Sequence, residues 1–258
     1  GMLGYASAAS NDLNQINIHD TGRGVQMSFY AGPQPYDNCY YNGQPWPWNP
    51  IEGGDIYGHA SPFTYTISSN AINVTTTPLQ WACNNVACEC EFTKYIYLDQ
   101  NAIWVEATLY NHRSDQTDYG ARSQEDPAAY IIGDNYVLYT YVGNSPWTNA
   151  PLTQWTNASM PGGAWYPGYV NGVSENWMAF INPATNFGVG LYHPSVSSFL
   201  AGFSGTPGSG GPYDNPTGYI SALQTVDVTY NITFKYNFAI ILGYLEDIRS
   251  YVYEYHSN

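Results

Sequence analysis

Positive charge is scarce in this 258-residue chain, which has six Lys and Arg residues against 20 Asp and Glu. The formal net charge of −14 argues against nucleic acid as a partner, because phosphate binding depends on Lys and Arg side chains. The same shortage excludes a polybasic membrane-binding surface. No apolar run approaches the roughly 18 residues of a membrane-spanning helix. We therefore expect neither a nucleic acid nor a membrane as partner.

Charge of either sign is also sparse, at 10% of residues, whereas aromatic residues make up 17% and include 26 tyrosines. An apolar content of 44% argues against a disordered chain. A chain rich in Tyr, Gly and Asn and poor in Lys is typical of an extracellular β protein. The opening GMLGYASAAS lacks the basic start and long apolar centre of a signal peptide, so we expect a mature or trimmed form.

Cysteine is limited to four residues, Cys39, Cys83, Cys88 and Cys90. Zinc would need all four as thiolates or a nearby His, and the single residue between Cys88 and Cys90 is shorter than the usual spacer. We therefore expect two disulfides in an oxidising compartment, and neither a metal nor a cofactor. We favour Cys39 reaching into the cluster of the other three. Cys88–Cys90 is the least favoured pair, on the expectation that alternating strand residues point to opposite faces.

Three sequons match the acceptor pattern for N-glycosylation, at Asn73, Asn157 and Asn231. They fit a secreted glycoprotein, in agreement with the composition.

Alternation of apolar and polar residues with period two recurs nearly throughout the chain and predicts strands. Helical periodicity is confined to 245–255. We therefore predict an all-β fold: a single antiparallel β-sandwich domain spanning residues 1–258, with long loops and a short C-terminal helix. The predicted strands lie in 63–77, 88–99, 102–111, 135–143, 177–183, 187–194 and 218–243.

The stretch NIHDTGRGVQMSFYAGPQPY (17–36) places Arg23 before a short alternating segment. There Val25, Met27 and Phe29 share one face of the predicted strand, and Gln26, Ser28 and Tyr30 the other. The polar face is either an ordinary wet surface or the floor of a binding site with Arg23 at its edge.

A long loop at 32–59 carries Trp46 and Trp48 around a proline, followed by Asp55 and His59. Indole rings on a stiff loop are suited to stacking against sugar faces. The alternative is that the tryptophans hold the loop down and the acids are solvated. Long ordered loops are usually functional, so we retain these residues as candidates for the site.

The region 101–131 offers a third set of polar side chains. Glu106 shares a predicted strand face with Trp104, Thr108 and Tyr110, either on a solvated exterior or in a cleft. A turn then leads to the further candidates Arg122, Gln124, Glu125 and Tyr130. The alternative for Arg113 and Arg122 is pairing with nearby aspartates in surface bridges that contribute little.

The segment 102–130 resembles the middle of galactose-mutarotase-like β-supersandwich domains. YNHRSD (110–115) matches their turn, QEDPAAY (124–130) lies where such domains often place site residues, and GRGVQ (22–26) resembles an early strand that supplies an Arg in some of them. The resemblance covers about half of the chain. It implies a supersandwich fold and a glycan ligand, in a fold shared by hydrolases, lyases and sugar-binding domains.

A secreted carbohydrate-active enzyme is the first function hypothesis. For glycoside hydrolysis, Glu125 is the candidate acid and Glu106 or Asp55 the second carboxylate. Substrate would be bound by Arg23, Gln26, Tyr30, Trp46, Trp48, Arg122, Gln124 and Tyr130. For elimination on a uronate polymer, Arg23 would neutralise the sugar carboxylate and His59 or Tyr30 would take the proton.

Two other hypotheses need no paired carboxylates. A non-catalytic, lectin-like protein would bind glycan through Trp46, Trp48 and the Tyr-rich loops. A structural extracellular protein would use its Tyr and Gly content for assembly.

Overall fold

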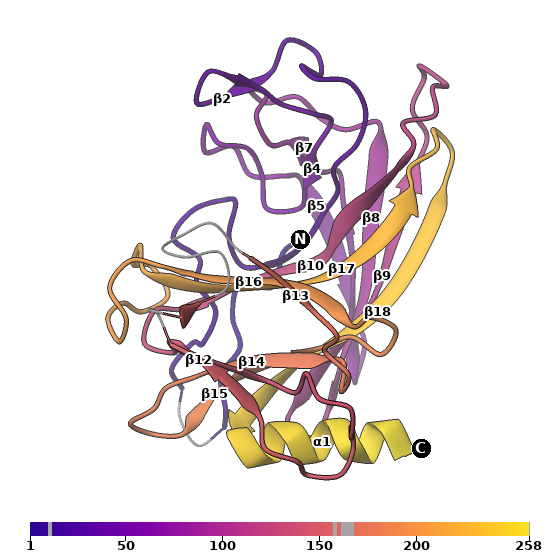
Figure 1. Ribbon diagram of the computed structural model, residues 1–258. Helices are drawn as coiled ribbons and strands as arrows, with labels where there is room; N and C mark the ends of the chain where they lie inside the picture. The colour runs from indigo at the N-terminus through magenta and orange to yellow at the C-terminus, as the bar shows by residue number, and fades with distance from the viewer. Residues whose placement is uncertain (10–11, 157–158, 161–167, 258) are drawn as a thin grey trace.

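The computed structural model describes residues 1–9, 12–156, 159–160 and 168–257, which form two large antiparallel sheets, a two-stranded ribbon and one helix (Figure 1). The all-β sandwich predicted from the sequence is confirmed. In spatial order, the seven-stranded sheet consists of β13 (Gly168–Asn171), β16 (Ser198–Ser204), β17 (Thr217–Asp227), β10 (Ala121–Ile132), β1 (Val25–Ser28), β4 (Pro50–Ile51) and β7 (Leu79–Gln80).

The nine-stranded sheet contains most of the strands predicted from alternation, and β9 has the predicted bounds. Its order is β12 (Thr153–Trp155), β11 (Val137–Thr140), β14 (Trp177–Ile181), β15 (Phe187–Tyr192), β18 (Thr233–Tyr244), β9 (Ala102–Asn111), β8 (Cys90–Asp99), β6 (Ala71–Thr76) and β5 (Phe63–Ile67). The segments 63–77 and 218–243 each divide into two strands, since each contains a turn.

The main core lies between the two sheets and follows the alternation of the strands. Met27 of β1 and Phe29, which follows β1, point toward the nine-stranded sheet, where Phe92 of β8 and Leu109 of β9 meet them. The rings of Phe29 and Phe92 are 5.5 Å apart. Burial of these side chains is the main favourable contribution to the association of the sheets.

Helix α1 (Leu245–Ser257) covers part of the other face of the nine-stranded sheet and lies at the bottom of Figure 1. Ile248 and Val252 are fully buried there, and Trp104 of β9 donates a hydrogen bond from Nε1 to the Tyr251 hydroxyl at 2.6 Å. This confirms the predicted C-terminal helix. No helix among the described residues is long and apolar enough to cross a membrane.

The long loop at 32–59 stands above β10 and β17 in Figure 1 and contains the ribbon β2 (Tyr40–Tyr41) and β3 (Gln44–Pro45). A disulfide between Cys39 and Cys83, with a Cα–Cα distance of 5.0 Å, ties this loop to the residues after β7. The expectation that Cys39 reaches into the cysteine cluster is confirmed.

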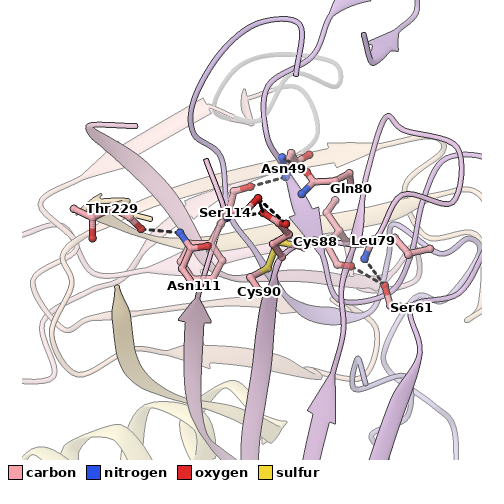
Figure 2. Close-up of a disulfide and its surroundings, with 12 residues drawn as sticks. Asn49, Ser61, Leu79, Gln80, Cys88, Cys90, Asn111, Ser114 and Thr229 are labelled. Carbon is pink, nitrogen blue, oxygen red and sulfur yellow. Dashed lines mark hydrogen bonds between the residues drawn. A yellow bond between two sulfur atoms is a disulfide. The ribbon is translucent and has the colours of Figure 1, made fainter. Parts of the chain in front are cut away.

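The second disulfide joins Cys88 and Cys90, the pair least favoured from the sequence, and that prediction was wrong (Figure 2). The physical reason is that residues two apart in an extended chain point to the same face, not to opposite faces. Cys90 begins β8 opposite Asn111 of β9, and Cys88 lies just before the strand with its N–H bonded to the carbonyl of Pro78 at 2.8 Å.

The segment 121–132, which was not among the predicted strands, forms strand β10, and residues 124–130 lie in its middle. Glu125 pairs with Leu223 of β17, and the next pair is Ala128 with Ser221. Asp126 and Pro127 therefore form a β-bulge, where a proline does not interrupt the ladder. The bulge lets β10 run the full length of the sheet despite its proline.

Candidate functional site

Glu125 occupies the face of the seven-stranded sheet that is turned away from the nine-stranded sheet. Its neighbours in register are Ser28 on β1 and Leu223 on β17. Tyr130 and Tyr219, which pair with each other across β10 and β17, lie on the same face. The site is thus built from three adjacent strands, each contributing alternate residues.

Two tyrosines are hydrogen-bonded to the carboxyl group of Glu125. The Tyr30 hydroxyl donates to Oε2 at 3.3 Å, and the Tyr219 hydroxyl forms a second bond. The ring of Tyr219 makes an edge contact with Tyr130, with centroids 4.8 Å apart. Leu200 and Leu223 pack into the same small apolar cluster. A carboxyl group held by phenols above an apolar floor is the central feature of this face.

Burial raises the pKa of Glu125, and the hydrogen bonds from Tyr219 and Tyr30 oppose that shift. Burial likewise raises the pKa of both tyrosines well above the ordinary value, and the nearby Glu125 carboxylate adds to the effect. The tyrosines therefore stay protonated and donate, and Glu125 has a raised pKa typical of a general acid.

The loop at 32–59 brings an aromatic group toward this face. The ring of Tyr41 lies 5.1 Å from Trp46 and 6.2 Å from Trp81, centroid to centroid. Trp46 donates from Nε1 to Asn49 Oδ1 at 3.0 Å, and Asn49 contacts the Ser28 hydroxyl at 3.4 Å. This chain of contacts connects the aromatic group to the strand beside Glu125.

Arg23 lies at the edge of the site, near Tyr130. Burial raises the pKa of Tyr130, and the positive charge of Arg23 opposes that shift. Its Nε pairs with Asp20 at 3.2 Å, and its two terminal nitrogens bond to Asn17 and Asn215 at 2.7 to 3.2 Å. The guanidinium thus fastens the segment before β1 to the loop before β17. Three hydrogen bonds and one ion pair thus engage this guanidinium within the protein.

Three further candidate residues are enclosed by structural contacts. The Gln26 amide bonds to Gly22 O at 2.6 Å and to Gly53 N at 2.8 Å. The Gln124 amide bonds to both backbone groups of Tyr30, at 2.6 and 2.9 Å. Trp48 is fully buried, with Arg113 above its ring at 5.6 Å. The two amides are therefore engaged in holding backbone segments, and Trp48 is part of the core.

The structure does not bring Glu106, Asp55 or His59 to Glu125. Glu106 is exposed on the opposite face of the nine-stranded sheet, on the side that α1 covers in part. Asp55 is fully buried and accepts a hydrogen bond from the His59 ring at 2.8 Å. It also accepts hydrogen bonds from three backbone N–H groups, those of Tyr57, His59 and Asn85. This carboxylate orders the loop around it.

The two arginines after β9 also lie apart from Glu125. Arg113 is buried, pairs with Asp115 at 3.2 Å and lies 3.2 Å above the Tyr119 ring, so it is not a surface bridge. Arg122 is on β10 opposite Val226, one of the buried core residues. Its side chain therefore starts on the core face of the sheet, opposite to that of Glu125.

The sequons can be placed for two of three positions. Asn73 is exposed on β6, and Asn231 is exposed in the turn between β17 and β18. Asn157 lies outside the described residues.

Sequence reasoning missed Tyr219, Asn49 and Trp81. Tyr219 was within a predicted strand, and its alternation with Ile220 was a usable signal. The other two are isolated loop residues whose role depends on contacts with Ser28 and Tyr41.

A wide hollow of about 580 Å³ lies elsewhere, on the outer face of β6, β8, β9 and β18, and is lined by residues such as Thr93, Tyr95 and Glu106. We place the candidate site at Glu125 because a carboxyl group with a raised pKa lies there beside several phenols. Among the described residues, no group of three or more His, Cys, Asp or Glu is arranged to hold a metal ion.

Comparison with known proteins identifies the fold. The chain resembles a galactose mutarotase-like protein from Lactobacillus casei ATCC 334, with a TM-score of 0.53 and 12% identity over 90% of each chain. It also resembles the alpha-N-acetylgalactosaminidase NagBb from Bifidobacterium bifidum, with a TM-score of 0.50 and 10% identity, over 98% of this chain and 38% of that one. The chain has the galactose-mutarotase-like β-supersandwich fold, as the sequence resemblance implied. Neither the protein-family models nor the curated protein sequences give a match.

Proposed function

We propose that the face around Glu125 binds a neutral carbohydrate and that Glu125 transfers a proton to or from a sugar oxygen. The observation that carries this proposal is the half-buried Glu125 carboxyl, whose pKa burial raises and which is hydrogen-bonded by Tyr30 and Tyr219. Sugars present both hydroxyl groups and apolar C–H faces, which match a floor of phenols and leucines. The fold, which is shared with carbohydrate-related proteins, supports the same ligand class.

A neutral saccharide fits better than a uronate polymer. Arg23 is the cation of this region, and its donors are engaged by Asp20, Asn17 and Asn215. A uronate carboxylate would therefore meet Glu125 and Asp20 without a free guanidinium to neutralise it. The net charge of −14 adds long-range repulsion against an anionic polymer. Elimination on a uronate is thus the less favoured reaction.

The chemistry proposed for Glu125 is that of a single acid. Hydrolysis by two carboxylates would need a partner across the substrate. Asp126, the neighbour of Glu125 in sequence, is fully buried next to Tyr236 in the core, and Asp20 is paired with Arg23. A protonated Glu125 can donate to a ring or glycosidic oxygen, and its conjugate base can then take a proton from water or a sugar hydroxyl.

A glycan-binding protein without turnover is the second candidate. The aromatic group of Tyr41, Trp46 and Trp81 favours it, since stacked rings bind sugar faces without any acid. We also propose that the protein acts outside the cell, on the basis of its two disulfides and its composition.

The test compares wild-type protein with Glu125→Gln on a panel of neutral mono- and oligosaccharides. Three readouts are used: binding by titration calorimetry, anomer interconversion by polarimetry, and release of reducing ends. We expect Glu125→Gln to bind within a few-fold of wild type but to turn over about 10²- to 10⁴-fold more slowly, the usual contribution of a general acid. Glu106→Gln, which is exposed on the other sheet, is the matched control and keeps both properties.

The outcomes separate the candidates. Binding by the wild type without turnover supports the glycan-binding protein. Full turnover by Glu125→Gln, or no saccharide bound or altered by the wild type, refutes the proposal. Degradation of uronate polymers alone would show that the neutral class is wrong.

A further inference from the structure

Strand β5 (Phe63–Ile67) is an edge strand of the nine-stranded sheet, and β6 is its one partner in the ladder among the residues that the structure describes. All five of its residues are exposed. Its second edge therefore presents backbone N–H and C=O groups to solvent, a ready template for another strand.

One face of this strand is apolar. Phe63, Tyr65 and Ile67 are 55%, 61% and 71% exposed and lie on the side of the sheet that carries the core. They border an apolar groove of about 500 Å³, which also involves Ile72 and Leu3. The seven-stranded sheet does not cover this end of the nine-stranded sheet. The apolar side chains that would be core elsewhere are left uncovered here.

The protein does not protect this edge with charge. Residues 56–88 contain no Asp, Glu, Lys or Arg, although the whole chain carries 26 such side chains. Natural edge strands usually carry a lysine, an inward-pointing charge or a bulge that prevents pairing. In a chain with a net charge of −14, a strand within an uncharged stretch can approach a second copy of itself without local repulsion between like charges.

We propose that two copies of this chain associate through β5, which pairs with itself in antiparallel orientation about a two-fold axis at Tyr65. In this register Tyr65 faces Tyr65, Phe63 faces Ile67, and Thr64 faces Thr66. Because facing residues differ in number by an even count, every apolar side chain meets an apolar one. The threonines meet on the opposite face, where cross-strand Thr pairs are favourable. The two nine-stranded sheets become one continuous sheet.

The first test measures the mass of the folded protein by sedimentation over a range of concentrations. We expect a monomer–dimer equilibrium in the wild type. Tyr65→Lys places two ammonium groups opposite each other on the axis and weakens the dimer at least about 10-fold, since facing like charges oppose pairing. Tyr213→Lys is the matched control, because Tyr213 is a 75% exposed tyrosine in a loop far from β5 in sequence, and it leaves the equilibrium unchanged.

The second test uses cross-linking to read the register. All four native cysteines are in disulfides, so one introduced cysteine is the single free thiol. Facing residues of an antiparallel pair have Cα atoms about 4.5–5.5 Å apart, which suits a disulfide. Tyr65→Cys should therefore form a covalent dimer on mild oxidation. Phe63→Cys should not, because its own copy lies four residues away along the partner strand.

A monomer at every concentration overturns the proposal. Equal cross-linking of Tyr65→Cys and Phe63→Cys overturns the register, and with it the two-fold pairing. A dimer that Tyr65→Lys does not weaken assigns the interface to another surface, and also refutes the proposal.

Discussion

At the scale of single residues, the most unusual group is Asp126, in the bulge beside Glu125. Its side chain is fully buried, and neither carboxyl oxygen has a hydrogen-bond partner among the described residues. The nearby Tyr236 hydroxyl is also buried without a hydrogen-bond partner among the described residues. Burial, together with the Glu125 charge, raises the pKa of Asp126 well above its ordinary value. A protonated Asp126 is therefore the form that the core tolerates best.

This predicts a pH-dependent effect of Asp126→Asn on the free energy of unfolding. The folded state binds the proton more tightly than the unfolded state, so stability is greatest below the unfolded pKa and falls as pH rises through the folded pKa. The asparagine variant has no proton to lose at this position, so its free energy of unfolding does not fall for this reason as pH rises. We expect it to match wild type near pH 4 and to be more stable than wild type near pH 8, as measured by urea unfolding. Asp37→Asn, an exposed control, should show no such difference, and an Asp126→Asn variant that is equally destabilised at both pH values would contradict the prediction.

At the scale of elements, a buried ion pair links the two sheets. Lys94 of β8 lies 2.8 Å from Oε1 of Glu52, which follows β4, and both side chains are almost completely buried. Glu52 Oε2 also accepts the N–H of Met27 on β1 at 3.1 Å. The pair therefore fixes how β8 sits against β1 and β4 within the sandwich.

Replacing Lys94 alone should lower the free energy of unfolding more than replacing both members of the ion pair. Lys94→Met leaves a buried carboxylate without its cation and should lower the free energy of unfolding by about 3–5 kcal/mol. Adding Glu52→Leu removes that charge and should recover part of the loss, although the Met27 N–H loses its acceptor. Denaturant unfolding of both variants measures the difference. A double variant no more stable than Lys94→Met would show that the unpaired Glu52 carboxylate is not the cause of the lost stability.

At the scale of the whole molecule, the two disulfides constrain the chain very differently. Cys39–Cys83 spans 44 residues and ties the long loop over the face that carries Glu125, whereas Cys88–Cys90 spans two. Loop-closure entropy grows with the length of the closed segment. Only the first bond therefore restricts the unfolded chain substantially.

Removing each bond by paired alanine substitution should show this contrast. Loss of Cys39–Cys83 should lower the free energy of unfolding by about 4 kcal/mol, and loss of Cys88–Cys90 by less than about 2 kcal/mol. Denaturant unfolding gives both values, after thiol titration has shown no free sulfhydryl in the wild type. Equal losses would contradict the entropic argument.

Local patterns in the sequence predicted most strands of the nine-stranded sheet and the C-terminal helix, but not β10 or β16 of the seven-stranded sheet. The alternation in 102–111 and the helical period in 245–255 are local properties, set by which face of an element is apolar. The shared face of Gln26 and Ser28 followed from the same alternation, whereas Glu125 as the candidate acid stays a prediction. The mutarotase-like resemblance also gave the fold.

Tertiary structure alone decided which of these residues meet. Tyr30 and Glu125 are 95 positions apart, and their contact depends on the register between β1 and β10 and on the bulge at Asp126 and Pro127. The spacing of carboxylates along the chain did not show that Glu106 faces away on the other sheet. The uncovered edge at β5 follows from the unequal extent of two sheets. Such features arise from pairing between distant segments, and no local pattern encodes that pairing.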